Sequence, residues 1–488
     1  MQTRSGSARR GVRAVITSTA VAVATIAGTA APAAAAPAAR GAPAARGAVA
    51  AAQTVIPGFP AVFSWGYNQS GENGDGTTTP KATPEPVLGL PSNRGLQIGA
   101  KQLASSPLAE TNAALLTNGT VWAWGRNSFG ELGDGTTTDR HTAVQVAGLT
   151  GITQIAVGTF HMMAVGAGGT VWSWGHNDYG QLGNGTTTSR DVPGQVPGLT
   201  GVTQLAAGPD YSLALRSNGT VLAWGTNSGG QLGDGTETSR TSPEQVPGLT
   251  GIIQVAAGDG NSYALRSDGT LLAWGRGYLG NGQTASTTPV PVPLAGVTQV
   301  ATSGDDTLAL VGSGGQVWSW GINFEGEIGD GTANVPRTSP VKINLSGITQ
   351  VSEGLDASMA LRSDGSLFAW GSNAQFGLGL GGNVPYALVP TFVSYLTNVT
   401  GVAEGGEGGI AAGQYDAATI PSVVGDTQSE ASTALQAAGF ALGRVSQVVD
   451  ITCEFIGEVK TQSPAAGTLA RLGTAVNVAI GKPGGKCL

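Results

Sequence analysis

The hydrophobic and polar residues of this chain alternate in short runs separated by turn residues. In one unit the run Thr220-Val-Leu-Ala-Trp-Gly225 follows Ser217-Asn218-Gly219, a turn sequence suited to the positive φ of a β-hairpin. Two strand-like runs precede that turn, at 212–216 and 202–207, and a fourth apolar piece lies around Val246. The pattern therefore predicts a unit of four short antiparallel strands.

This unit recurs along the chain. A Trp-Gly pair stands at seven places, with steps of 59, 50, 50, 50, 46 and 50 residues between them: Trp65, Trp124, Trp174, Trp224, Trp274, Trp320 and Trp370. Four-stranded repeats of this length are typical of propeller blades. We therefore expect an all-β fold over residues 59–414, a seven-bladed β-propeller of four-stranded blades. The seven tryptophans are predicted to pack between blades rather than to bind a ligand.

The two ends of the array indicate how the ring closes. The first Trp-Gly strand, Ala61 to Trp65, has no partner strands before it, and the last unit, 401–412, stops before a Trp-Gly strand of its own. The two fragments together make one blade, so the N-terminal strand is predicted to close the last sheet and remove its open edge.

The residues of the repeat resemble those of a known family. The motif Val-Trp-Ala-Trp-Gly-Arg-Asn-Ser-Phe-Gly-Glu-Leu-Gly-Asp-Gly-Thr at 121–136, with copies at 171 and 221, resembles the propeller repeats of the regulator of chromosome condensation family. So does Ala-Leu-Arg-Ser-Asp/Asn-Gly at 214, 264 and 360. The resemblance covers roughly residues 59–414 and implies the propeller fold. That family usually has His-Ser ahead of the Ala-Leu strand, and here only His161 keeps the histidine, so guanine-nucleotide exchange is not implied.

The N-terminal residues are typical of an export signal. Four arginines precede an apolar run from Ala14 to Ala30, and small residues follow at every candidate cleavage position, so we predict a signal peptide over 1–36. Residues 37–58 are rich in Ala and Pro and are predicted to be a flexible leader. The protein is then secreted, extracellular or associated with a bacterial cell wall, and has no stable membrane insertion after cleavage.

Charge excludes one class of partner. The formal charge of the 488-residue chain is −7, and removal of the four signal arginines makes it −11. Nucleic acid requires a basic surface, so we expect no nucleic-acid partner.

The periodicity changes after Gly413. Thr427-Gln-Ser-Glu430 has the spacing of a helix capping box and precedes Ala431, Leu435 and Ala438 on one helical face. Strand-like runs follow at 440–449, 457–461 and 475–480, and 420–425 supplies a strand before the helix. The pieces Pro421-x-Val423-x-Gly425, Gln462-Ser463-Pro464-x-x-Gly467-Thr468 and Gly473-Thr-x-Val476 resemble a PASTA domain, here 418–482, a small α+β module. That resemblance implies an association with peptidoglycan.

Both cysteines lie in this C-terminal part. In an exported protein, Cys453 and Cys487 are expected to form a disulfide that ties the tail, 483–488, to the module. Two sulfurs alone cannot complete a zinc site.

The sequence offers few groups for catalysis. The histidines, His141, His161 and His176, share no metal-ligand spacing, and no nucleophile elbow stands between a strand and a helix. The Gly-Asp-Gly and Gly-Asn-Gly pieces lack the carboxylate spacing of a calcium loop. We therefore expect no enzyme activity, no catalytic residue, no metal and no cofactor.

One face of the ring is a candidate binding surface. An even number of antiparallel crossings separates the Ala-x-Gly tip of each unit from the loop after Trp-Gly, so both emerge on the same face. The second residue after the tip glycine is often acidic, and aromatic residues lie in the neighbouring loops, which suggests a protein-binding surface. The candidate residues are Phe129, Phe160, Tyr179, Asp210, Tyr211, Asp306, Asp356 and Glu407, with Tyr278 in the shortened fifth unit.

Three functions remain open at this point. The first is a secreted, non-catalytic propeller that binds an extracellular protein and is held near the cell wall by the PASTA-like module. The second is a proteinaceous inhibitor of a β-lactamase or penicillin-binding protein, since exported bacterial propellers of this repeat type include β-lactamase inhibitory proteins. The third is a propeller lyase or another enzyme.

Overall fold

The computed structural model describes residues 56–57, 61–93, 96–106, 110–382, 384–406, 408–414, 416–467, 469–471 and 474–484. The predicted signal peptide, most of the predicted leader, Glu407 and Cys487 lie outside the described residues. No helix in the described part of the chain is long and apolar enough to cross a membrane.

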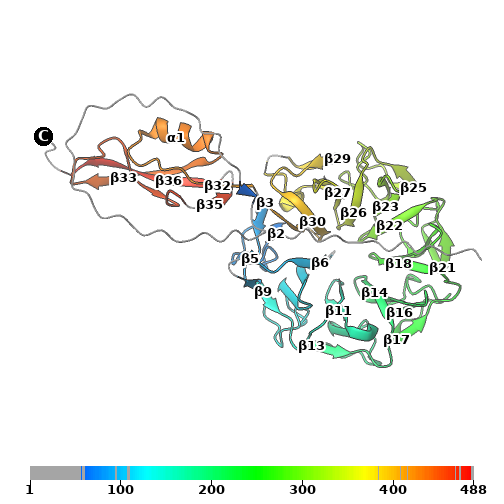
Figure 1. The fold of residues 1–488 in the computed structure, drawn as a ribbon. Coiled ribbons are helices and arrows are strands. Elements are labelled where there is room, and N and C mark those ends of the chain that lie inside the picture. The colour runs from blue at the N-terminus through cyan, green and yellow to red at the C-terminus, as the bar shows by residue number, and fades with distance from the viewer. Residues whose placement is uncertain are drawn as a thin grey trace, which may run out of the picture. The chain divides into compact units, whose positions relative to one another are not determined.

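The Trp-Gly repeats fold into seven four-stranded antiparallel sheets, as predicted, and Figure 1 shows them arranged as the blades of a ring. The strand nearest the ring centre comes first in each of the first six blades. Blade 1 holds β6 (Ala100–Ser105), β7 (Thr111–Leu116), β8 (Val121–Gly125) and β9 (Arg140–Gln145). Blade 2 holds β10 (Gln154–Val157), β11 (His161–Val165), β12 (Val171–Gly175) and β13 (Arg190–Gln195). Blade 3 holds β14 (Val202–Ala207), β15 (Tyr211–Arg216), β16 (Val221–Gly225) and β17 (Arg240–Gln245).

The next three blades keep this order. Blade 4 holds β18 (Ile252–Ala257), β19 (Asn261–Arg266), β20 (Leu271–Arg276) and β21 (Ala285–Pro291). Blade 5 holds β22 (Val297–Thr302), β23 (Thr307–Val311), β24 (Gln316–Gly321) and β25 (Arg337–Lys342). Blade 6 holds β26 (Ile348–Glu353), β27 (Ala357–Arg362), β28 (Leu367–Ser372) and β29 (Tyr386–Phe392).

Blade 7 closes the ring with strands from both ends of the array. Its order is β30 (Thr397–Glu404), β31 (Gly409–Gln414), β2 (Ala61–Gly66) and β3 (Lys81–Pro86). Strand β2 runs antiparallel to β31, with Ala61 opposite Gly413 and Ser64 opposite Ile410. The predicted closing strand is therefore confirmed, and the N-terminal part contributes a second strand, β3, at the outer edge of the same blade.

The repeated tryptophans join neighbouring blades. All seven are at most 1% exposed, which confirms that they belong to the core. In six of them the indole Nε1 donates to a backbone carbonyl in the loop of the preceding blade, as in Trp124 to Glu72 at 2.8 Å and Trp65 to Gly377 at 2.7 Å. Because the donor and the carbonyl are both buried, each bond satisfies two groups that water cannot reach.

The seventh tryptophan, Trp320, has a different partner. The loop of the preceding blade is shortened, and the indole Nε1 of Trp320 donates instead to the hydroxyl oxygen of Tyr263, at 3.2 Å. That tyrosine is fully buried, and its hydroxyl donates in turn to the carbonyl of Tyr278 at 3.2 Å. A tyrosine on β19 thus replaces the missing loop carbonyl.

Replacing Tyr263 by Phe should destabilise the propeller. The substitution keeps the ring but leaves Trp320 Nε1 and the carbonyl of Tyr278 without this partner, a loss of roughly 1–3 kcal/mol for each buried group left unsatisfied. Denaturant unfolding of the purified protein measures this difference. The matched control is Tyr386→Phe, on a half-exposed side chain, which should change the free energy of unfolding by less than about 0.5 kcal/mol.

Glutamine side chains join the inner strands around the centre of the ring. Gln102 on β6 donates to the carbonyl of Ile155 at 2.8 Å and accepts from the Ile155 amide at 2.9 Å. Equivalent glutamines extend from blades 2 to 6 to the next inner strand: Gln154, Gln204, Gln254, Gln299 and Gln350. Blade 7 has Gly401 at this position. These bonds satisfy inner-strand backbone groups that the sheets leave unpaired.

The C-terminal module is a three-stranded sheet with one helix. Strands β33 (Ala441–Asp450) and β36 (Ala475–Pro483) are parallel, and β34 (Val459–Ser463) pairs with β36 on its other side. The helix α1 (Gln428–Ala437) begins with the predicted capping box, in which the Glu430 amide donates to Thr427 Oγ1 at 3.3 Å and the Thr427 amide donates to Glu430 Oε2 at 2.9 Å. Its buried residues, Ala431 and Leu435, pack with Val423, Phe440 and Val476.

The strand expected at 420–425 lies elsewhere. The strand before the helix is β32 (Asp416–Thr419), which pairs with β1 (Ile56–Pro57) and β35 (Leu469–Arg471), while 420–426 has no strand pairing. Pro421 has no N–H to donate to a ladder, and Gly425 has a φ of +93°, so this segment cannot continue as a regular strand. A further short pair, β4 (Ser92–Asn93) and β5 (Leu96–Gln97), lies before blade 1.

Candidate functional site

The tips and the long loops share one side of the ring, which we call the loop face. It consists of the tips between the first two strands of each blade and the loops after the Trp-Gly strand. Backbone bonds join the two, as in Thr226 N to Asp210 O at 2.9 Å and His176 N to Phe160 O at 2.8 Å. The predicted emergence of tips and loops on one side is therefore confirmed. The Asn-Gly and Asp-Gly hairpins form the opposite side, the hairpin face.

Aromatic residues from blades 1 and 2 meet on the loop face. The ring centroid of Phe129 lies 5.1 Å from that of Phe160 and 4.5 Å from that of His176. Tyr179 lies 6.5 Å from His176, edge to face. Phe129 is 36% exposed and Tyr179 is 48% exposed. We call Phe129, Phe160, His176 and Tyr179 the aromatic cluster; three of its members were predicted from the sequence, and the structure adds His176.

Charged groups surround this cluster. The guanidinium of Arg126 lies over the ring of Phe160, 5.0 Å from its centroid. His176 Nε2 is 3.1 Å from Asp178 and its Nδ1 is 3.6 Å from Asp210. Asp210, followed by Asp178, raises the pKa of His176, and burial opposes them. The aromatic cluster thus combines three aromatic rings, Phe129, Phe160 and Tyr179, with a histidine that lies between two carboxylates.

The amide of Gln181 joins the same network. Its Nε2 lies 2.9 Å from Asp210 Oδ1 and 2.9 Å from His176 Nδ1. Sequence reasoning missed Arg126, Asp178 and Gln181, although all three stand in the long loops, two, four and seven residues after the Trp of a Trp-Gly pair.

Two predicted surface residues are buried, which corrects the sequence-based interpretation. Tyr211 is 0% exposed, and its hydroxyl donates to the carbonyl of Asn261 at 2.6 Å. Asp306 is also 0% exposed, and its Oδ1 accepts from the Ile322 amide at 2.7 Å. Neither side chain can contact a partner on the loop face.

The error at Asp306 has a physical origin. Tyr211 pairs with Gly225 in blade 3, and Thr307 pairs with Trp320 in blade 5, so Asp306 stands opposite Gly321 at the strand position of Tyr211. The tips of blades 3 and 5 have the same length, since Ala207 pairs with Ser212 and Thr302 with Thr307, but the glycine of blade 5, Gly304, stands one residue later. The tip position in blade 5 is therefore Asp305, which is half-buried. The tip acids are therefore Glu110, Asp210, Asp305 and Asp356, while Glu407 lies outside the described residues.

Burial raises the pKa of several carboxyls in the tips and loops of the loop face. Burial, opposed by hydrogen bonds and reinforced by the Glu110 carboxyl, raises the pKa of Glu72 to about 8. Burial also raises the pKa of Asp356, with a further contribution from Glu325, and the pKa of Asp305, with a contribution from Asp259. The predicted aromatic Tyr278 is half-buried and accepts the hydrogen bond from Tyr263 through its carbonyl.

His161 and Ser212 lie at a distance typical of a catalytic histidine and serine. His161 Nε2 lies 3.0 Å from Ser212 Oγ. Both residues are 0% exposed, Ser212 Oγ donates to the Gln181 carbonyl at 2.9 Å, and burial lowers the pKa of His161 to about 4. A substrate cannot reach this hydroxyl in the described conformation, so the pair is part of the blade contact. Among the described residues, no group of three or more His, Cys, Asp or Glu side chains is placed to hold a metal ion.

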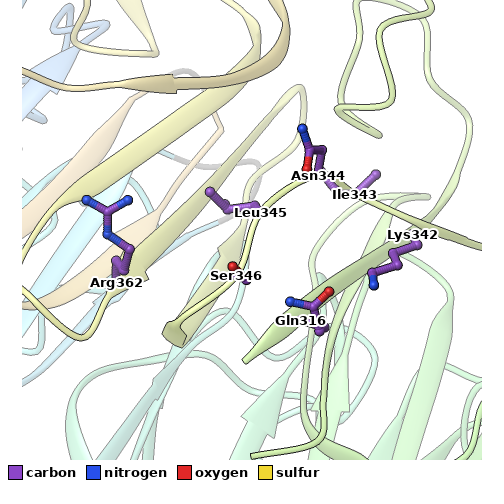
Figure 2. A pocket seen from close by; sticks show the side chains of 7 residues that line it. All are labelled: Gln316, Lys342, Ile343, Asn344, Leu345, Ser346 and Arg362. Atoms are coloured by element: carbon purple, nitrogen blue, oxygen red, sulfur yellow. The ribbon is translucent and has the colours of Figure 1, made fainter. Parts of the chain in front are cut away.

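The hairpin face carries a separate cavity of about 440 Å³ between blades 5 and 6. Figure 2 shows its two cationic side chains, Lys342 and Arg362, at opposite sides of the view; they come from different strands, β25 and β27. Arg362 is 2.8 Å from Asp364 and lies over the ring of Phe368, so its charge is already engaged. This cavity offers no converging set of polar groups. The disulfide predicted for Cys453 and Cys487 stays a prediction, because Cys487 lies outside the described residues.

Comparisons with known proteins agree with this architecture. The chain is 32% identical over 96 residues to the E3 ubiquitin-protein ligase HERC2 of Homo sapiens, and this match covers 20% of the chain and 2% of that protein. It is 34% identical over 106 residues to the ultraviolet-B receptor UVR8 of Arabidopsis thaliana, covering 21% of the chain and 22% of that protein. The chain therefore spans only a small part of these curated relatives. Yeast RCC1 (Prp20), solved bound to Kap60, has the same fold, with a TM-score of 0.64 and 22% identity over 75% of this chain and 91% of that chain.

Family models cover the two parts of the chain. The model of the RCC1-like domain matches residues 59–352, more than half of the chain, and that of the regulator of chromosome condensation (RCC1) repeat matches 364–412. The model of the PASTA domain matches 418–482. The chain therefore belongs to the RCC1-like domain family and carries a PASTA domain after its propeller.

Proposed function

We propose that this protein is an exported, non-catalytic propeller that binds a protein partner through its loop face and is held near the bacterial cell wall by its PASTA domain. The aromatic cluster is the observation that carries this proposal. Exposed aromatic side chains on a rigid scaffold lose little conformational entropy on binding and are the usual anchors of protein interfaces.

The surroundings of the cluster favour a partner with basic groups. Asp178 is exposed, Asp210 is partly exposed, and the tip acids Glu110, Asp305 and Asp356 continue around the same face. Like charges gathered on one face raise the negative potential there and speed the association of a positively charged surface. The interface would then combine aromatic anchors on blades 1 and 2 with acidic groups on blades 1, 2, 3, 5 and 6.

The wall association and the absence of catalysis have separate supports. A PASTA domain is expected to associate with peptidoglycan, which would keep the propeller close to wall proteins. The Ser212 and His161 pair is buried among blade contacts, and the loop face offers binding groups rather than an activated nucleophile.

The double substitution Phe129→Ala with Tyr179→Ala should abolish capture of the partner. Immobilised full-length protein is incubated with the culture fluid and the wall extract of the source cell, and bound proteins are identified by mass spectrometry. Loss of two anchor side chains at about 1–3 kcal/mol each weakens binding by roughly 10²-fold or more. Binding of the identified partner should also weaken as the salt concentration rises.

The matched control is Tyr386→Ala, which removes an aromatic side chain of similar exposure from the outermost strand of blade 6. It should capture the same proteins as the unmodified chain. Equal capture by the double variant would place the binding surface elsewhere and refute the role of the aromatic cluster.

A further inference from the structure

The inner strands end in a ring of seven equivalent positions around the centre of the propeller. Each is the last residue of the innermost strand of its blade, and together they line one cavity of about 250 Å³ on the loop-face side. Figure 1 shows the strands that carry them facing the ring centre. In blade order the residues are Ser105, Val157, Ala207, Ala257, Thr302, Glu353 and Glu404.

The side chains at these seven positions are apolar on one side of the mouth and polar on the other. Blades 2 to 4 contribute only the small apolar side chains Val157, Ala207 and Ala257. Blades 6 and 7, which are neighbours, contribute two glutamates, and hydroxyl residues flank them on blades 5 and 1. Since five blades close without an acid at this position, packing of the fold does not require Glu353 or Glu404.

Among the described residues, no hydrogen bond or ion pair offsets the burial of the Glu404 carboxylate. Glu404 is 3% exposed, and neither of its carboxylate oxygens has a hydrogen-bond partner among the residues that the structure describes. Glu353 is 5% exposed, and within the described part of the chain its side chain accepts only from Ser358 Oγ, at 3.0 Å from each oxygen. Among the described residues, neither glutamate forms an ion pair with a lysine, arginine or histidine.

Such a buried carboxyl lowers stability unless a cation pairs with it. Unpaired buried polar groups of this kind are typical of binding sites, because the bound ligand supplies the missing partner and offsets the loss of stability. Ser105 supplies a further polar side chain, because it lines the same cavity on the blade next to that of Glu404.

We propose that this mouth of the central cavity binds an alkylammonium group, as carried by a lysine side chain or a small aliphatic amine. The ammonium would pair with Glu404 and Glu353 on one side of the mouth. The hydrocarbon stem would lie against Val157, Ala207 and Ala257 on the other side. The three N–H donors of an ammonium suit two carboxylates and a neighbouring hydroxyl, and the unbranched stem suits small apolar side chains.

Other cations fit this mouth less well. A divalent metal such as Ca²⁺ takes six to eight oxygen ligands, whereas no group of three or more described His, Cys, Asp or Glu side chains is placed to hold a metal ion. A guanidinium binds one carboxylate through a planar fork, whereas here the two carboxylates come from different blades.

Titration of the full chain with n-pentylammonium chloride at pH 8 tests the proposal by isothermal calorimetry. We expect saturable binding of one equivalent, with no binding of n-pentanol, which has the same stem without the charge. Glu404→Gln and Glu353→Gln should each weaken binding at least 10-fold. Glu244→Gln, an exposed glutamate on the outermost strand of blade 3, should bind as the unmodified chain does.

The glutamine variants keep the shape of the side chain, and thermal unfolding verifies that they are folded. Absence of binding by the unmodified chain, unchanged binding by Glu404→Gln, or tighter binding of CaCl₂ or agmatine than of pentylammonium would each overturn the proposal. These outcomes are independent of partner capture by the aromatic cluster, which Glu404→Gln leaves intact.

Discussion

Deletion of residues 59–66 should destroy the cooperative stability of the propeller. These residues include β2, whose Phe63 and Trp65 are at most 1% exposed, and β2 is the strand that joins β31 to β3. Loss of a buried Phe or Trp side chain alone removes about 3–5 kcal/mol, comparable with much of the stability of an ordinary domain. The deletion also leaves β31 as an open sheet edge, which favours aggregation. Thermal unfolding and size-exclusion chromatography with light scattering measure the two effects.

The control is a deletion of equal length in the predicted leader, residues 45–52, which should leave both measurements unchanged. A Trp65→Ala variant separates loss of packing from loss of the strand: it should be destabilised by about 3–5 kcal/mol and remain a monomer. A deletion variant that unfolds at the same temperature as the intact chain and stays monomeric would contradict the observed closure.

The fold could be predicted because the repeat carries redundant information. Each blade repeats the same turn, the same alternation of hydrophobic and polar residues and the same Trp-Gly pair. An error in the prediction of one unit is therefore corrected by the others. Closure could be predicted for a related reason: an array that begins with one strand and ends without it has a single way to leave no open edge.

The individual surface residues were harder to predict. Counting from the tip glycine places Asp306 at the tip, yet the glycine of blade 5 stands one residue later in the tip than that of blade 3. Asp305 is therefore the tip residue, and Asp306 takes the buried strand position. Tyr211 follows a tip acid and was expected beside it, but successive strand residues point to opposite faces, so it packs inside. Burial at a strand end depends on register, which a count from one residue does not fix.

The mouth of the central cavity was missed for a different reason. Its seven positions are equivalent in the repeat, since each is the last residue of an inner strand. Aligning the seven units would have shown glutamates in two neighbouring blades and smaller residues in the others. Sequence comparison between blades could therefore have found Glu353 and Glu404. Their burial and the missing partners of Glu404 could not be foreseen, because they depend on how neighbouring tips cover the carboxylates.

These buried carboxyls should make the propeller more stable in mild acid than in mild base. Burial raises the pKa of Glu404, Glu353 and Asp306 well above the usual range, and the Asp306, Glu327 and Glu404 carboxyls contribute at Glu353. For such groups the stabilising contribution is fully present below the pKa of the unfolded chain, about 4, and is lost as the pH rises through the raised pKa of the folded state.

The opposite trend limits stability at low pH. Four aspartates pair with cations in the loops: Asp75 with Lys81, Asp134 with Arg140, Asp234 with Arg240 and Asp330 with Arg337. Burial acts to raise their pKa values, but hydrogen bonds from a threonine and from the paired cation outweigh it and lower them. Their contribution is present above the pKa of the unfolded chain and is lost as the pH falls through the lowered pKa. The melting temperature should therefore pass through a maximum between these two ranges.

The substitution Glu404→Gln should reduce the loss of folding stability at basic pH. The amide keeps the shape of the side chain and carries no charge, so the variant avoids ionisation of an unpaired buried carboxyl and should be more stable than the unmodified chain at pH 8, by about 1–3 kcal/mol. At pH 4.5, where the carboxyl is protonated, the two proteins should differ little. Thermal and denaturant unfolding between pH 4 and 9 measures the difference, with Glu244→Gln as the exposed control that should follow the unmodified chain throughout. A Glu404→Gln variant that is less stable than the unmodified chain at pH 8 would mean that the carboxylate is compensated in solution, and it would remove the energetic argument for a cation at the mouth of the cavity.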